Sequence, residues 1–115
     1  MKISFEGIGQ WSATFACGGE VAEGQMVKVS GSGEVSACAA GDKFCGVAEV
    51  VARDGAACAV ILGGMVTAAY TGTAPAAGWG NLSANGNGGV KTDSNGGSYL
   101  IVDVDTAAKT VTFVL

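Results

Sequence analysis

Glycine-containing turns recur about every 8 to 12 residues along this 115-residue chain, with short apolar runs between them. Examples are Gly31-Ser32-Gly33, Asp54-Gly55 and residues 85–89 (NGNGG). Turns at this spacing leave room for strands, whereas a helix usually needs ten or more residues. No window keeps apolar residues at helical spacing over that length. The chain is therefore predicted to be all-β.

Alternation of apolar and polar residues marks the individual strands. In residues 98–105, for example, Val102 and Val104 share one face and Asp103 and Asp105 the other. About nine or ten short strands are expected, which favours a small β-barrel or sandwich. A single helical turn is expected only at residues 73–77. The clearest strands are predicted at 25–29, 34–38, 45–51, 57–62, 65–70, 98–105 and 109–115.

The chain also repeats itself with a period of about 54 residues. In each copy a short strand leads to a polar glycine turn and then to an isolated valine, Val35 or Val90. The other aligned segments are 22–25 with 76–79, 31–33 with 86–88, 47–55 with 100–108, and 58–62 with 111–115.

This duplication suggests a domain organisation. A half of about 50 residues with few large side chains buries little surface alone, so the two halves are expected to share one core. We expect residues 20–115 to form a single β-barrel domain built from halves 20–70 and 74–115. Residues 1–19 are expected to form an N-terminal arm or first strands, outside the duplicated part.

Composition excludes several classes of function. The chain has no histidine, which removes the commonest general base and metal ligand. Its formal net charge is −4, without the basic patch of a nucleic-acid binder. No apolar run is long enough to span a membrane. Glu6 is a charged residue in the N-terminal stretch where a signal peptide would need its apolar core. We expect no enzyme activity, no cofactor, and neither nucleic acid nor membrane as a partner.

The four cysteines, Cys17, Cys38, Cys45 and Cys58, form no C-x-x-C pair and lie beside small or apolar residues. The preferred interpretation is reduced thiols that act as small hydrophobic residues. Disulfides are the alternative that the even number leaves open.

Polar clusters are interpreted mainly as structural. The glycine clusters carry no Lys followed by Ser or Thr, so they are interpreted as turns and not as phosphate loops. Asp103 and Asp105, with Asp93, would make a conceivable calcium site, but a solvated strand face is the simpler interpretation, and no metal site is predicted.

The order of several short motifs resembles the small β-barrel capsid cement, or head decoration, proteins of tailed bacteriophages and prophages. That family has an "aGd-V" strand, a "GVA" strand, a hairpin and a "v-l-G-v" strand. The resemblance covers residues 20–115, most strongly 22–67. The matching segments are AEGQMVKV (22–29), GDKFCGVA (41–48), DG (54–55), CAVIL (58–62) and GGMVT (63–67).

The resemblance implies a structural virion protein on the outer surface of an icosahedral head, synthesised in the bacterial host cytoplasm. Its partners would be the major capsid protein and itself, as a homotrimer. The expected interface residues are Ile3, Phe5 and Ile8 in the arm, together with Trp11 and Trp79. The two tryptophans are the largest side chains and have two interpretations: they fill the barrel core, or they are exposed as interface anchors.

An alternative is a non-catalytic protein- or carbohydrate-binding β module, such as a phage tail or fibre accessory. It would need exposed aromatic side chains in a groove. The aromatic residues available for this are Trp11, Trp79, Tyr70 and Tyr99.

Overall fold

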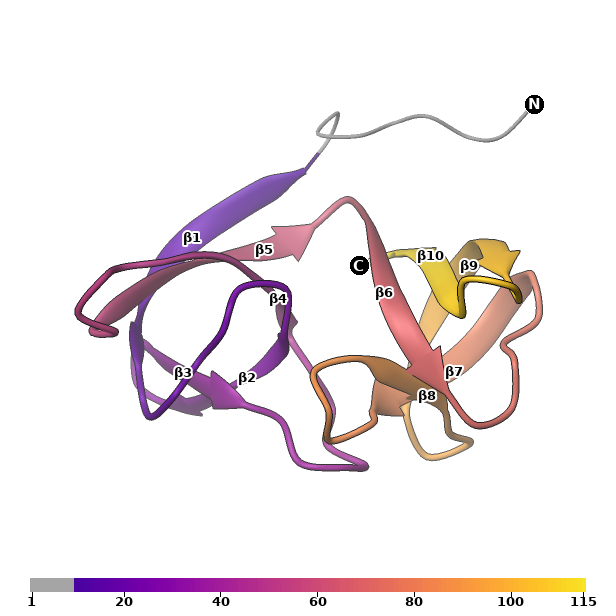
Figure 1. The fold of residues 1–115 in the computed structure, drawn as a ribbon, viewed down its shortest axis with the longest axis horizontal. Coiled ribbons are helices and arrows are strands. Elements are labelled where there is room, and N and C mark those ends of the chain that lie inside the picture. The colour runs from indigo at the N-terminus through magenta and orange to yellow at the C-terminus, as the bar shows by residue number, and fades with distance from the viewer. Residues whose placement is uncertain (1–9) are drawn as a thin grey trace.

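The computed structural model describes residues 10–115, which form ten strands and no helix (Figure 1). No helix in this part of the chain could therefore cross a membrane. The all-β prediction is confirmed, and residues 73–77, where a helical turn was expected, lie in the loop after β6. The strands are β1 (Trp11–Cys17), β2 (Met26–Gly31), β3 (Glu34–Ala37), β4 (Gly46–Val51), β5 (Ala57–Gly63), β6 (Met65–Thr71), β7 (Gly78–Ala84), β8 (Val90–Thr92), β9 (Gly97–Asp105) and β10 (Thr110–Val114).

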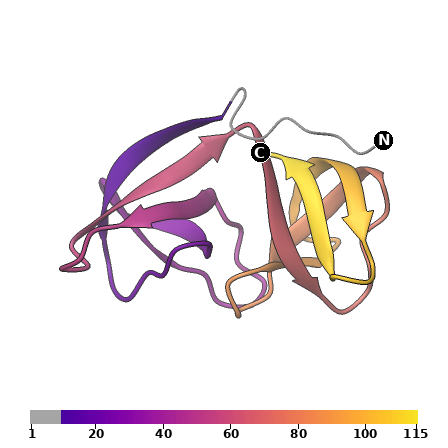
Figure 2. The same cartoon turned by 45° about the horizontal axis from the view of Figure 1, so that its top comes forward.

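The strands close into two five-stranded barrels that lie side by side (Figures 1 and 2). The first barrel has the strand order β1-β3-β2-β4-β5, and the second has β10-β6-β8-β7-β9. In Figure 1 the first is coloured indigo to magenta, and the second runs to yellow at the C-terminus. Closure leaves neither sheet with a free edge strand.

The two barrels have the same topology, which confirms the duplication. β1 pairs in parallel with β3, as β6 does with β8, and all other pairings are antiparallel. Even an irregularity repeats: Glu49 is skipped in the β4–β5 register and Val102 in the β9–β10 register. Residues that hold the same pairing position in the two barrels are called equivalent below.

The topology corrects the prediction of a single barrel shared by halves 20–70 and 74–115: each copy closes a barrel of its own, and the division of the chain is different. β1 pairs with β3 and β5, so residues 11–17 form the first strand of the first barrel, which is the second of the two alternatives expected for residues 1–19. β6 pairs with β8 and β10, so residues 65–71 belong to the second barrel. The boundary lies at Gly64. The repeat signal missed β1 because its sequence, WSATFAC, has little in common with the MVTAAYT sequence of β6.

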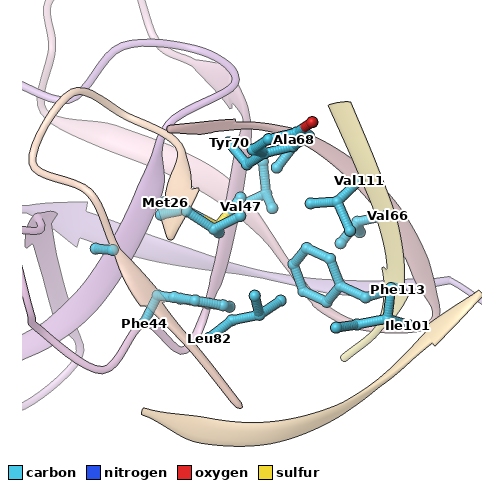
Figure 3. Close-up of a cluster of buried hydrophobic side chains, with 12 residues drawn as sticks. Met26, Phe44, Val47, Val66, Ala68, Tyr70, Leu82, Ile101, Val111 and Phe113 are labelled. Carbon is cyan, nitrogen blue, oxygen red and sulfur yellow. The ribbon is translucent and has the colours of Figure 1, made fainter. Parts of the chain in front are cut away.

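The main core fills the second barrel and continues into the first (Figure 3). Met26, Phe44 and Val47 of the first half pack with buried residues of the second. The Phe44 ring stacks on Tyr99 at 5.1 Å between centroids and meets the edge of Phe113 at 5.8 Å. A smaller cluster fills the first barrel with Val27, Val35, Ala48, Cys58 and Val60.

Candidate interaction surface

Trp79 is the most exposed large apolar side chain, with 76% of its surface accessible. It lies within β7 between Gly78 and Gly80, where β7 pairs with β9 on one side, and the pairing with β8 begins only at Leu82. An indole fixed on a strand and left in solvent is typical of an interface anchor, since Trp is enriched at binding hot spots.

Trp79 is part of an apolar row on the outside of the second barrel. Its cross-strand partner is Leu100 of β9, which pairs with Val114 of β10, which pairs with Met65 of β6. Directly opposed residues point to the same face of a sheet, and the neighbours Ile101 and Phe113 point into the core. Leu100, Val114 and Met65 are half-buried. These four residues are called the outer row below.

Trp11, the other predicted anchor, opens β1 and is 59% exposed. Its indole lies over Gly63 of β5, at the position that any side chain at residue 63 would occupy. Because Gly63 has no side chain, the indole of Trp11 packs directly against its backbone. The predicted interface residues Ile3, Phe5 and Ile8 lie outside the described residues.

The four aromatic residues considered for a sugar-binding groove do not share one surface. Tyr70 is buried in the second barrel, and Tyr99 is half-buried and stacked on Phe44. Trp11 and Trp79 are exposed but belong to different barrels. An open depression between residues 19–25 and 53–55 is lined by small and charged side chains and by no aromatic residue.

Two exposed apolar residues were missed by the sequence analysis. Val29 is 57% exposed near the end of β2, and Val50 is 56% exposed on β4 just after the skipped Glu49. The alternating pattern places Val29 on the same face as buried Val27. However, β4 pairs only with Met26 and Val27 of β2, so the part of β2 that contains Val29 has no partner in β4.

The cysteines offer poor nucleophiles. All four are free; Cys58 is buried and the others are half-buried. Burial raises the pKa of Cys58 to about 11, with a further contribution from a hydrogen bond to Cys17. Burial and the nearby Asp42 charge raise the pKa of Cys38 to about 11, and burial raises the pKa of Cys45. These three thiols therefore stay protonated at neutral pH, which disfavours the reactive thiolate.

The acidic residues considered for calcium act within local turns. Asp93 accepts hydrogen bonds from the Ser83 hydroxyl at 2.8 Å and from the Asn95 N–H at 2.9 Å. Asp105 accepts hydrogen bonds from the N–H groups of Ala107 and Ala108, both at 3.0 Å. Within residues 10–115, no three His, Cys, Asp or Glu side chains are grouped so that they could hold a metal ion.

The feature of the described chain best suited to binding is thus an apolar, outward-facing protein surface. No protein-family model matches the sequence, and a search of curated proteins found no match.

Proposed function

We propose that this protein is a capsid decoration, or cement, protein that binds the outer surface of an assembled phage head as a homotrimer. The observation that carries the proposal is the outer row, with Trp79 76% exposed on a strand of a closed barrel. A surface of this kind fits another protein. The resemblance of residues 22–67 to phage cement proteins supplies the class of partner, the major capsid protein.

The two-barrel architecture suits a reinforcing role. Every strand is paired on both sides, so the module resists opening and does not present an edge for uncontrolled strand addition. The chain is small, with extents of 39 × 28 × 22 Å, and packs tightly around glycine turns. Reinforcement of a shell requires stiffness and complementary surface, and no catalytic group.

The proposal is tested by co-sedimentation with shells assembled from the major capsid protein encoded in the same genome. We expect saturable binding to assembled shells, a fixed number of copies per shell, and a higher shell melting temperature. Unassembled capsid subunits serve as the control, because a decoration site is created by the assembled lattice. Failure to bind the shells, or equal binding to free subunits, would contradict the proposal.

The contribution of the segment before β1 is tested with a variant that lacks residues 1–9. Both barrels remain complete in this variant, since β1 begins at Trp11. If Ile3, Phe5 and Ile8 contact the capsid as proposed, shell binding falls while the melting temperature is unchanged. Full shell binding by the shortened chain would move the contact to the barrels.

A further inference from the structure

Pairing registers identify a counterpart of the outer row on the first barrel. Met26 pairs with Val47, Val47 with Ile61, and Ile61 with Ser12. The outer row pairs in the same order, Trp79 with Leu100, Leu100 with Val114, and Val114 with Met65. Val47 is therefore equivalent to Leu100, and Ile61 to Val114. Met26 lies beside Val47 as Trp79 lies beside Leu100, but the β2–β4 register is shifted by two residues relative to β7–β9, because the β2–β3 pairing makes Val27 the equivalent of Leu82.

The two rows have opposite environments. Met26 is 1% exposed and Val47 is also buried, because both pack into the core of the second barrel (Figure 3). Ile61 packs against that core. Trp79 is 76% exposed, and Leu100 and Val114 belong to neither core cluster. The first barrel thus has its outward apolar row covered, and the second does not.

The surface that receives the first row lies around the β7–β8 hairpin. The Met26 N–H donates a hydrogen bond to the Gly88 carbonyl at 3.0 Å. Gly41 N–H donates to the Ala84 carbonyl, and Ala84 N–H donates to the Asp42 carbonyl, both at 2.9 Å. Ala84 is 1% exposed as a result. This receiving surface is defined by Ala84 and Gly88.

The first barrel carries an equivalent receiving surface that is uncovered. Val29 pairs with Val35 as Ala84 pairs with Val90, so Val29 is the equivalent of Ala84. Gly33 precedes Val35 by two residues as Gly88 precedes Val90, but the Gly33 carbonyl already accepts a hydrogen bond from the Ala16 N–H at 2.9 Å, so Val29 defines this surface. Val29 is 57% exposed, and Gly33 is exposed in the β2–β3 turn. Within residues 10–115, each chain therefore presents one uncovered outer row and one uncovered receiving surface, whereas the corresponding row and surface are joined to each other within the chain.

We propose that a second copy of this chain covers these surfaces: the outer row of one copy, centred on Trp79, packs against the Val29 surface of the next. The contact would repeat between chains the barrel–barrel contact within each chain. It is heterologous, since each copy uses two different surfaces, and three such contacts close a ring. This inference rests on the proposed self-association and specifies its surfaces.

One difference between the rows fits this arrangement. The first barrel inserts Phe44 from its β3–β4 connection, residues 38–45, whereas the β8–β9 connection covers only residues 93–96. The second barrel therefore has no counterpart of Phe44 in its shorter loop. Its row instead carries the large Trp79 where the first has Met26. The indole supplies apolar bulk from the strand itself.

The test uses light scattering on size-exclusion peaks of the full chain over a range of concentrations. We expect the wild-type chain to associate. Trp79→Arg and Val29→Arg should each weaken association by about 30-fold or more, the loss typical of a hot-spot residue. Val50→Arg is the matched control, because Val50 is as exposed as Val29 but lies outside both surfaces. Equal disruption by Val50→Arg would overturn the proposal.

A mixing experiment tests the head-to-tail geometry. A Trp79→Arg chain keeps its Val29 surface, and a Val29→Arg chain keeps its outer row. Each should be monomeric alone, and a mixture should form a dimer of one chain of each kind. A symmetric contact of Trp79 with Trp79 would give no such dimer and would overturn the proposal.

Shell binding separates this inference from the proposed function. A wild-type monomer at all concentrations, or variants that associate as wild type does, would overturn the proposed interface. If the protein still bound shells in the co-sedimentation assay, capsid decoration would stand without this interface. If the wild-type chain did not bind shells but the mixed dimer still formed, only the capsid role would be contradicted.

Discussion

The two barrels share strand order, and all strand pairings but β2–β4 and β7–β9 have the same register, but their interiors are filled differently. Five buried positions of the first barrel have buried equivalents in the second, and in four of them the second barrel has the larger side chain. The equivalent pairs are Val27 and Leu82, Val35 and Val90, Ala48 and Ile101, Cys58 and Val111, and Val60 and Phe113.

The first strands of the two barrels extend this contrast. The inward residues of β1, Ala13, Phe15 and Cys17, are half-buried, whereas those of β6, Val66, Ala68 and Tyr70, are buried. The first barrel in turn contributes Met26, Phe44 and Val47 to the core of the second. The two barrels thus share one topology. The second barrel has a full core, whereas the first barrel has a thin core and depends on docking against the second.

The largest expected effect compares the equivalent positions Phe113 and Val60, both fully buried. Phe113→Ala should lower the free energy of unfolding by about 3–5 kcal/mol. Val60→Ala removes two methyl groups and should cost about 2 kcal/mol. Chemical denaturation of the three proteins measures both. Equal losses would show that the two interiors contribute equally to the free energy of unfolding, which would contradict the contrast between the two cores.

The next prediction concerns the contact that joins the barrels. Phe44→Ala removes the ring that packs against both Tyr99 and Phe113, and should cost about 3 kcal/mol. Because the first barrel has the thinner core, it should then unfold at a lower temperature than the second, giving two calorimetric transitions. Lys43→Ala, at the exposed neighbouring position, should keep a single transition. A single transition in Phe44→Ala would mean that other contacts couple the barrels.

The smallest effect is a loss of stability at alkaline pH that originates in the first barrel. The pKa of Cys58 is raised from an ordinary value near ~8.5 to about 11, so the unfolded chain loses this proton first. The contribution of the protonated thiol is complete below about pH 8.5 and is lost as the pH rises towards about 11. Thermal melts over this range should show a falling Tm.

Cys58→Val is the matched variant for this effect, because valine occupies the equivalent position 111 of the second barrel. It removes the ionisable group while keeping an apolar side chain. The fall in Tm with pH should be smaller in Cys58→Val than in the wild type. Identical pH profiles would assign the alkaline effect to groups other than this thiol.

Most of the strand pattern was predictable from the sequence because turns and alternation are local signals. The predicted strand at 98–105 corresponds to β9, and the aligned segments 58–62 and 111–115 correspond to β5 and β10. β1 was not recognised, because residues such as Thr14 and Ala16 give a weak apolar pattern and its pairing partners are distant in sequence. The candidate surface was predicted in part: Trp11 and Trp79 were named, and Val29 was not.

By itself, the sequence determined that the chain is all-β, where most of it turns, and that it contains two related copies, since these depend on neighbouring residues. Only the tertiary structure decided that each copy closes its own barrel and which equivalent residues meet solvent. Met26 of β2 and Trp79 of β7 both belong to the outward-facing rows of their barrels, yet one is buried and the other exposed. The physical reason is that burial of an outward face depends on what docks against it, and only one of the two rows has a barrel of the same chain to cover it.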